Sequence, residues 1–234
     1  MTFKHGVLAG MIKPYFETEK GVLYNGNCLE IMPLLNKVDL VLTDPPYGIG
    51  ETNERALSRG KIAEPIDYGF FDWDKNKVSD QHILSTVSAA KNSIIFGGNY
   101  YGGLPGDTSC YLVWDKDNGD NDFADCELAW TNFSTAVRKF KFRWNGMLQE
   151  CSGKDKEKRY HPTQKPVGLF FQILLKYSVD GNLILDPFAG VGTTALACER
   201  IGNREWILIE REEKYCEIAA KRIEQETKQL KLFD

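Results

Sequence analysis

Residues 183–210 read LILDPFAGVGTTALACERIGNREWILIE, in which two short apolar runs flank a glycine loop and a helical pattern. The same alternation extends over most of the chain, with apolar runs typical of strands at Val38–Thr43, Ser93–Phe96, Tyr111–Trp114, Leu183–Leu185 and Trp206–Ile209. Helical patterns lie near Gln81–Lys91, Pro166–Tyr177, Thr193–Ile201 and Glu212–Lys228. Strands that alternate with helices predict an α/β fold with a mostly parallel sheet and helices on both faces.

Length, hydropathy and cysteine usage restrict the class of protein. The 234 residues fit one domain over residues 1–234, and no apolar run is long enough to span a membrane. The six cysteines form no C-x-x-C pair, and with only three histidines they argue against a zinc site. Scattered cysteines without a secretion signal favour a reducing cytoplasm.

Two carboxylates and two glycines in residues 183–210 predict a nucleoside-binding βαβ unit. Asp186 ends the first strand, Gly190 and Gly192 form a tight loop, and Glu210 ends the second strand. Glycines let the backbone pass close to a ligand, and Glu210 can accept hydrogen bonds from both ribose hydroxyls. A dinucleotide fingerprint would have a third glycine where Ala195 stands, but alanine is sometimes tolerated there, so spacing alone leaves a dinucleotide open. Asp186 before the loop suits a ligand with an ammonium group and no pyrophosphate, such as S-adenosylmethionine.

Charge is unevenly distributed along the chain, whose net charge is −4. Residues 134–165 hold nine Lys/Arg and three Asp/Glu, a local charge of +6 that leaves −10 elsewhere. Such asymmetry is typical of a polyanion-binding face, although an uneven solvated surface would give the same count. Within it, AVRKFKFRW alternates aromatic and basic residues, which predicts a strand with one anchored and one basic face. That strand is either an edge strand kept soluble by lysines or a ribbon laid against phosphates.

Three motifs carry a family resemblance. TDPPYG, HPTQKPVGL and DPFAGVGTT, in that order, resemble the amino-methylating DNA methyltransferases, which methylate an exocyclic amine of adenine or cytosine. The catalytic motif precedes the cofactor motif, as in the permuted group called class beta. The resemblance extends from about Leu23 to Ile223 and implies a Rossmann-like, S-adenosylmethionine-dependent fold with circularly permuted motif order.

The resemblance also implies the residues that bind the cofactor. By position in its motifs these are Asn27, Cys28, Thr163, Gln164, Lys165, Asp186, Phe188, Gly190, Gly192, Thr193, Thr194 and Glu210. In the family the segment 163–166 covers the methionine end of the cofactor, and the segment around Asn27 meets its adenine ring. The family usually has Asp at the position of Asn27, so we expect weaker cofactor binding there.

The TDPPYG motif offers a chemistry for amine methylation. An exocyclic amine is a poor nucleophile because its lone pair is delocalised into the ring. The Asp44 carboxylate and the Pro45 carbonyl can accept its two N–H bonds, while Pro45 and Pro46 fix the backbone beforehand. Tyr47 offers a flat face for a flipped base, a stack worth about 1–3 kcal/mol. Standing alone, the motif would read equally well as an acid-Pro-Pro turn with a packing tyrosine.

The sequence favours one target base over the other and excludes one type of methylation. An initial Asp in this motif favours adenine N6 over cytosine N4, although exceptions exist. Methylation at cytosine carbon 5 needs a cysteine directly after proline, and no cysteine of this chain follows one. Structured RNA as substrate and a non-catalytic cofactor-binding module remain the alternatives, against which the intact motif argues.

DNA recognition is expected in two embedded elements, a loop at about 51–76 and the basic region at about 134–160. The best candidates for contacts to double-stranded DNA are Arg138, Lys139, Lys141, Arg143 and Arg159. Residues 115–127 fail the spacing of a calcium loop and are interpreted as an acidic turn, with Asp125 and Glu127 near the base pocket. Trp144 is expected to pack in the core more often than to stack on a base.

Partners outside DNA are less constrained by the sequence. The small recognition region is compatible with a homodimer, and a cognate restriction enzyme is one expected context. Residues Gln229–Phe233 resemble the short peptide by which bacterial proteins bind the replication sliding clamp, although the frayed end of the last helix is the favoured reading.

Overall fold

The structure, a computed structural model, describes residues 12–48, 77–101, 103–119, 124–145, 148–151, 156–160 and 163–230. The predicted recognition loop at 51–76 and the last three residues of the predicted clamp-binding segment therefore lie outside the described residues.

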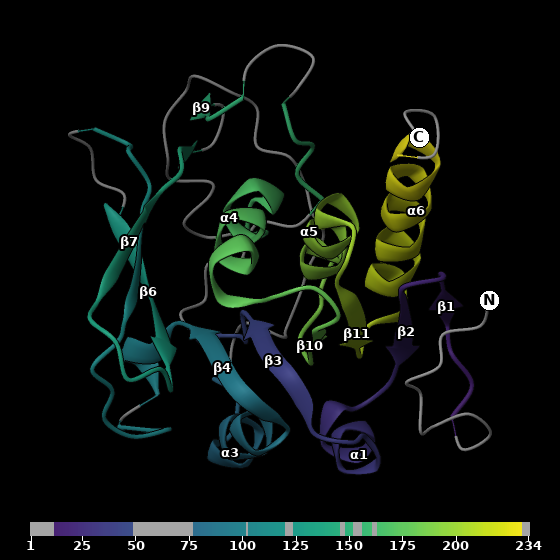
Figure 1. Cartoon of the computed structure of the whole chain (residues 1–234), viewed down its shortest axis with the longest axis horizontal. Coiled ribbons are helices and arrows are strands. Elements are labelled where there is room, and N and C mark those ends of the chain that lie inside the picture. The colour runs from purple at the N-terminus through teal and green to yellow at the C-terminus, as the bar shows by residue number, and fades with distance from the viewer. Residues whose placement is uncertain are drawn as a thin grey trace.

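Nine strands of the described residues form one sheet in the order β1-β2-β11-β10-β3-β4-β6-β5-β7 (Figure 1). Their bounds are β1 Phe16–Glu17, β2 Gly21–Asn25, β3 Val38–Thr43, β4 Ala90–Phe96, β5 Leu112–Asp115, β6 Cys126–Thr131, β7 Arg138–Lys141, β10 Leu183–Asp186 and β11 Glu205–Glu210. A separate hairpin pairs β8 Trp144–Asn145 with β9 Leu148–Gln149. The neighbours β2, β11, β10, β3 and β4 are parallel, which confirms the predicted mostly parallel sheet.

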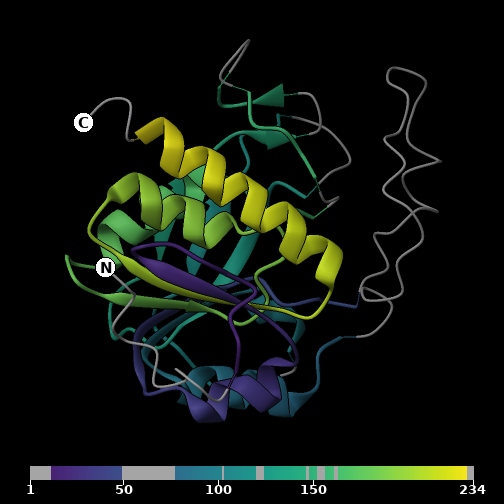
Figure 2. The same cartoon turned by 90° about the vertical axis from the view of Figure 1, so that its right-hand side faces the viewer.

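Helices cover both faces of the sheet, as predicted (Figures 1 and 2). One face carries α1 Cys28–Ile31 and α3 Asp80–Ser88, and the other carries α4 Val167–Tyr177, α5 Thr193–Ile201 and α6 Glu213–Leu230. Two short 3₁₀ helices are η1 Met32–Leu34 and η2 Gly98–Tyr100. No helix in the described ranges is both long enough and apolar enough to cross a membrane.

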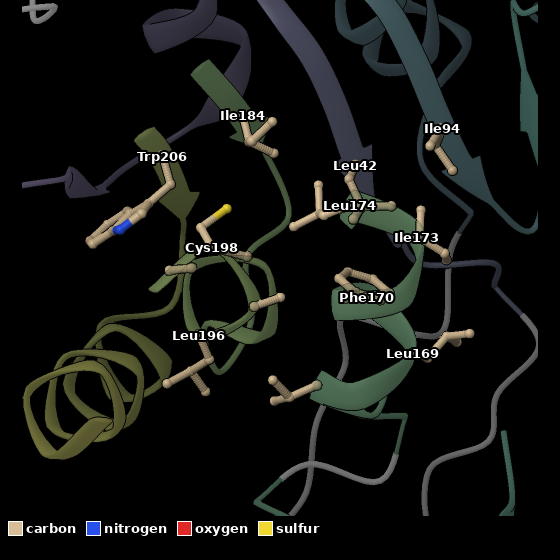
Figure 3. Close-up of a cluster of buried hydrophobic side chains, with 14 of the residues drawn as sticks. Leu42, Ile94, Leu169, Phe170, Ile173, Leu174, Ile184, Leu196, Cys198 and Trp206 are labelled. Atoms are coloured by element: carbon tan, nitrogen blue, oxygen red, sulfur yellow. The ribbon is translucent and has the colours of Figure 1, made fainter. Parts of the chain in front are cut away.

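The core that fixes the site lies between the sheet and helices α4 and α5. Figure 3 shows Phe170, Ile173 and Leu174 of α4 over Leu42 of β3 and Ile94 of β4, and all five are at most 2% exposed. Fully burying one such side chain stabilises a fold by about 1.5–3 kcal/mol. Because these helices are held on the sheet, the segments that lead into them are held at the carboxyl edge of the parallel strands.

Several sequence predictions need correction. The helix expected near Gln81–Lys91 ends at Ser88, because the following residues belong to β4, which pairs with β3. The segment interpreted as an acidic turn also contains structure: Asp115 ends β5 and Cys126 begins β6, and these strands pair antiparallel. Pro166 is the N-cap of α4 and lies just before its first turn.

The strand predicted from alternating aromatic and basic residues is confirmed over Arg138–Lys141, which form β7, whereas Trp144 belongs to the separate hairpin of β8 and β9. Phe140, Phe142 and Trp144 are buried, while Lys139 and Lys141 are exposed. Strand β7 lies at the edge of the sheet, and Trp144 packs in the core as expected.

Candidate active site

Two strand-ending carboxylates meet at the same edge of the sheet. Strands β3 and β10 are parallel neighbours, so Asp44 directly after β3 lies near Asp186 at the end of β10. Thr43 joins them, because its hydroxyl donates to Asp186 Oδ1 at 2.6 Å. The structure thus brings together the two motifs that the sequence separates by more than a hundred residues.

Asp44 is the centre of a group of side chains that we call the acceptor cluster, formed by Asp44, Pro45, Tyr47, Glu127 and Lys165. Lys165 Nζ donates to Asp44 Oδ2 at 2.6 Å, and the Tyr47 hydroxyl donates to Asp44 Oδ1. Lys165 also lies 3.1 Å from Glu127 Oε2, and its side chain is only 6% exposed. The Asp44 carboxylate, which directly follows β3, is therefore held by a buried cation.

Burial and ion pairing oppose each other in the acceptor cluster. Burial raises the pKa of Asp44, and the ammonium of Lys165 offsets part of that rise. Burial disfavours the Lys165 ammonium, but Asp44 and Glu127 outweigh it and raise the pKa of Lys165. Burial would also raise the pKa of Glu127, but Lys165 and Lys116 lower it to about 2. Glu127, predicted near the base pocket, lies against Lys165, and its lowered pKa favours the ionised carboxylate.

The Pro45 carbonyl is fixed by a tyrosine that the sequence analysis missed. The hydroxyl of Tyr101, a residue only 2% exposed, lies 3.2 Å from the Pro45 oxygen and 3.3 Å from the Phe96 oxygen. A carbonyl has two lone pairs, so Pro45 keeps one for another donor. The Tyr100-Tyr101 pair, which follows the end of β4 after the short segment Gly97–Asn99, was the signal that could have identified it.

The Tyr47 ring is packed on other groups. Tyr100 stacks on it with ring centroids 4.9 Å apart and an interplanar angle of 14°, and Tyr100 is 40% exposed. Gly97 has φ +74°, and a Cβ there would lie 2.1 Å from Tyr47 Cε1, so only glycine fits. The exposed ring of Tyr100 therefore covers one face of Tyr47, the ring on which the sequence analysis expects a flipped base to stack.

Asp186 has a different environment. Its Oδ1 accepts from Thr43 and from the Phe188 amide at 3.1 Å, and its Oδ2 accepts from the Thr194 hydroxyl at 2.6 Å. Burial raises the pKa of Asp186 to about 6, although these donors favour the anion. Asp186 therefore anchors the loop between β10 and α5 through neutral donors.

The glycine-loop corner, formed by Phe188, Gly190 and Glu210, borders this anchor. Glu210 Oε2 accepts from the Gly190 amide at 2.7 Å, and its Oε1 accepts from the Glu212 amide at 2.8 Å. Burial raises the pKa of Glu210 to about 7. Gly190 has φ +50°, and a Cβ there would meet nothing within 4 Å, so the loop backbone borders open space.

Other predicted cofactor residues have structural partners. Asn27 is the N-cap of α1 and accepts from the Leu29 amide at 3.0 Å, while Cys28 is buried in the first turn. Gly26 beside them donates its amide to the Glu210 carbonyl at 3.0 Å, which places this segment next to the glycine-loop corner.

The segment before α4 connects the two halves of the site. Gln164 donates to Glu157 Oε1 at 2.7 Å, and the Thr193 hydroxyl donates to the Lys165 carbonyl at 3.2 Å. Lys165, predicted with the cofactor segment, directs its ammonium to Asp44, while Thr163 lies two residues earlier in the same segment.

Four of the five predicted DNA contacts are exposed, whereas Arg159 is half-buried, and several of the five carry ion pairs. Lys139 lies 3.1 Å from Asp115, and Lys141 and Arg143 lie 2.9 Å and 2.5 Å from Asp117. The side chains of Arg138 and Arg159 complete the predicted set. Arg138 is exposed on β7, and the Arg159 guanidinium lies 5.7 Å from the centre of the Trp144 ring. Within the described ranges, no three His, Cys, Asp or Glu side chains are grouped so that they could hold a metal ion.

Comparison with known sequences gives consistent matches. The family model N6_N4_Mtase, described as DNA methylase, matches residues 113–221. The Type II methyltransferase M2.MboI of Moraxella bovis is 27% identical over 263 residues, which cover 94% of each chain. The Type II methyltransferase M2.DpnII of Streptococcus pneumoniae is 25% identical, over 96% of this chain and 97% of its own.

Solved structures share the fold. The M1.HpyAVI–SAM complex has a TM-score of 0.55 at 24% identity, covering 86% of this chain and 98% of its own. The PvuII DNA methyltransferase, described as cytosine-N4-specific, has a TM-score of 0.57 at 17% identity, covering 93% and 95%. These likenesses confirm the predicted Rossmann-like fold.

Proposed function

This chain is a relative of the amino-methylating DNA methyltransferases, and from that relation we propose that it methylates adenine N6 in double-stranded DNA with S-adenosylmethionine as the donor. The observation that carries the proposal is the acceptor pair of Asp44 and Pro45, oriented by Lys165 and Tyr101, next to the glycine-loop corner. We further propose that it acts in the cytoplasm within a restriction-modification context.

The glycine-loop corner fits S-adenosylmethionine. Three features of this corner suit a nucleoside. The Gly190 backbone borders open space, Glu210 supplies a carboxylate, and Phe188 supplies an aromatic ring whose centre lies 6.0 Å from that of His82. When bound, the cofactor supplies an activated methyl group on a sulfonium. We assign its binding to the segments 27–28, 163–165, 186–194 and Glu210, with Asp186 and Thr194 acting as anchors of the loop.

Asp44 and Pro45 would orient the target amine. The remaining lone pairs of the Asp44 carboxylate and the Pro45 carbonyl can each accept one N–H of the amine. This pulls the nitrogen towards a pyramidal geometry and makes its lone pair available to the methyl donor. Because Tyr101 and Lys165 fix the acceptors before substrate arrives, little reorganisation is needed at the moment of reaction.

Tyr47 would hold the target base after it leaves the helix stack. A base amine inside a duplex is inaccessible, so the base must be flipped into the site. In the structure Tyr100 covers one face of Tyr47, and the proposal requires Tyr100 to move aside or to take part in the stack. Its exposure at the surface is compatible with either.

Cytosine N4 is the second candidate base. The fold likeness to PvuII methyltransferase, which is described as cytosine-N4-specific, keeps this reading open. Both bases present an exocyclic amine to the same acceptors, so Asp44 and Pro45 serve either reaction. The initial Asp of the catalytic motif favours adenine.

A labelled-methyl transfer assay tests the proposal. Unmethylated genomic DNA is incubated with the protein and labelled S-adenosylmethionine, digested to nucleosides and analysed by mass spectrometry, with Asp44→Ala as control. The expected product is N6-methyladenine, which should be absent with Asp44→Ala. If the product is N4-methylcytosine, the target base is cytosine and the assignment of adenine is wrong. Cofactor binding without label in any DNA would contradict the proposal and favour RNA or a non-catalytic module.

A further inference from the structure

The acceptor cluster contains two charged residues, Lys165 and Glu127, that do not contact the amine in the chemistry described above. We infer that Lys165 and Glu127 form a positioning pair for Asp44: the Lys165 ammonium keeps the Asp44 carboxylate ionised and aimed at the amine, and Glu127 holds Lys165 in place. The inference rests on the proposed function and adds two residues whose contribution acts through Asp44.

The geometry of Lys165 supports this role. Its ammonium donates to Asp44 Oδ2 at 2.6 Å and to the Tyr47 hydroxyl at 3.3 Å, and it forms an ion pair with Glu127 Oε2 at 3.1 Å. An ammonium only donates hydrogen bonds, so these three contacts direct it towards Asp44, Tyr47 and Glu127. If Lys165 turned towards another partner, the half-buried Asp44 carboxylate would lose its cation.

Glu127 is anchored from its other side. Lys116 Nζ lies 2.7 Å from Glu127 Oε1, and Lys116 also lies 5.1 Å from the centre of the Trp114 ring. Trp114 of β5 pairs in register with Glu127 of β6, and Lys116 directly follows the end of β5. The chain of charges runs from Lys116 through Glu127 and Lys165 to Asp44, and its start is built into the sheet.

The protonation state of Asp44 decides whether it can do its work. An ionised carboxylate only accepts hydrogen bonds, whereas a protonated one would donate to the amine and compete for the nitrogen lone pair. Burial disfavours the anion and can raise the pKa of a carboxyl by several units, while an adjacent cation opposes this. Among the described residues, the titratable groups that act on Asp44 or touch it are Lys165, Glu127, Tyr47, Tyr101 and Asp186. Lys165 is the one cation in this set.

Two substitutions should therefore change the pH dependence in opposite directions. Lys165→Met removes the cation, so the pKa of Asp44 should rise and activity should become limited by its ionisation. Because a carboxyl buried without a cation favours its neutral form, activity should be reduced at pH 7 and should recover as pH increases. Glu127→Gln removes an anion that raises the pKa of Asp44, so it should lower that pKa.

A fixed position for Lys165 predicts a second effect of Glu127→Gln. With one partner weakened, Lys165 loses part of its orientation, and we expect kcat to fall about fivefold to tenfold without a new acidic limb. Lys165→Arg keeps the cation and should show no new limb either, although its larger planar group should reduce kcat.

The experiment is a pH profile of kcat from pH 5.5 to 9.5 for wild type, Lys165→Met, Lys165→Arg and Glu127→Gln on duplex DNA at saturating S-adenosylmethionine. Lys91→Met is the matched control, because Lys91 also pairs with an aspartate, Asp39, at 2.7 Å, but with its side chain 66% exposed. Thermal melting and cofactor affinity report on folding. The wild-type rate tests the proposed function, and the ratio of variant to wild type across pH tests the inference.

We expect the pH profile of Lys165→Met to show a new fall of kcat at low pH, with activity recovering towards high pH. The profile of the control should be unchanged. A loss that is equal at every pH would overturn the inference and leave Lys165 as a structural tie. If Lys165→Met does not fold, Glu127→Gln decides: a reduced kcat with unchanged cofactor affinity supports the positioning pair, and wild-type kcat overturns it.

Discussion

The residues 44–47 follow β3 and read Asp-Pro-Pro-Tyr, and the residues 186–188 close β10, its neighbour, and read Asp-Pro-Phe. Both carboxylates are at the carboxyl end of a buried parallel strand. Asp44 is held by an ammonium and a phenol, whereas Asp186 is held by two threonine hydroxyls and one amide. Similar local sequence has produced two different environments.

The difference teaches that the role of each carboxylate is set by residues far away in sequence. Neutral donors hold Asp186 without a counter-ion, so burial raises its pKa to about 6 and it serves as a loop anchor. Lys165, 121 residues after Asp44, gives Asp44 a cation that supports its ionised form. One strand end is suited to orient a reacting amine, and the other to shape a binding loop.

The largest expected effect is on the rate of methyl transfer when Asp44 is changed. Asp44→Asn removes the charge and turns one acceptor into a donor, so we expect kcat to fall about 10³-fold, by analogy with the loss of one oriented group at a reacting centre. Steady-state methyl transfer measures it. Asp107→Asn, an exposed aspartate, is the control and should retain wild-type activity, whereas a loss under tenfold in Asp44→Asn would contradict the assignment.

The role of Asp186 as the loop anchor should be seen in how the free energy of unfolding depends on pH. The pKa of Asp186 in the folded protein, about 6, lies above its ordinary value, so the folded state binds the proton more tightly. Stability from this group is therefore gained as pH falls through 6 and is absent at higher pH, and two units correspond to about 3 kcal/mol. Asp186→Asn cannot titrate.

Urea unfolding of both proteins between pH 4 and pH 7.5 checks this difference. The free energy of unfolding of wild type relative to Asp186→Asn should increase towards low pH. Parallel curves would show that Asp186 has an ordinary pKa and would remove the contrast with Asp44.

A smaller effect is expected at the glycine-loop corner. Burial raises the pKa of Glu210 to about 7, so affinity for S-adenosylmethionine should weaken below pH 7 as the carboxylate is protonated. Glu210→Gln should weaken binding about tenfold to hundredfold, the range for losing hydrogen bonds to a charged group, and should flatten the pH dependence. Isothermal titration calorimetry from pH 5.5 to 8.5 measures both. Unchanged affinity in the variant would exclude Glu210 from the cofactor site.

The smallest effect concerns the aromatic rings that follow the two strands, Tyr47 after β3 and Phe188 after β10. Tyr47 is stacked by Tyr100, whereas Phe188 has the His82 ring 6.0 Å away. Such an aromatic pair contributes about 0.5–1.5 kcal/mol, so Tyr100→Ala should lower the KM for DNA by twofold to tenfold if a base must replace Tyr100. Tyr15→Ala, another exposed tyrosine, is the control. An increased KM would indicate instead that Tyr100 itself stacks on the base.

The sequence predicted the parts of the fold that depend on local pattern. The bounds of β3 and α5 agree with the predicted ranges, because an uninterrupted apolar run and a glycine-started helix are strong local signals. Strand β6 was missed because its first residues continue an acidic, turn-rich segment, and its partner β5 determines its conformation.

The motifs predicted which residues meet at the site but not how they contact each other. Asp44, Asp186 and Glu210 were found because each directly ends or follows a strand. The pairing of Lys165 with Asp44 and the contact of Tyr101 with Pro45 depend on which strands are neighbours, and no local pattern encodes that order.

The most direct test of the contrast is a single-turnover methyl-transfer rate, measured for Asp44→Asn and Asp186→Asn at saturating S-adenosylmethionine. We predict a slow reaction with wild-type cofactor affinity for Asp44→Asn. For Asp186→Asn we predict weakened cofactor binding and a rate within about tenfold of wild type once the site is filled, because the proposed mechanism has Asp44, and not Asp186, accept a hydrogen bond from the amine. Equal losses of rate in both variants at saturation, or lost cofactor binding in Asp44→Asn alone, would contradict the account.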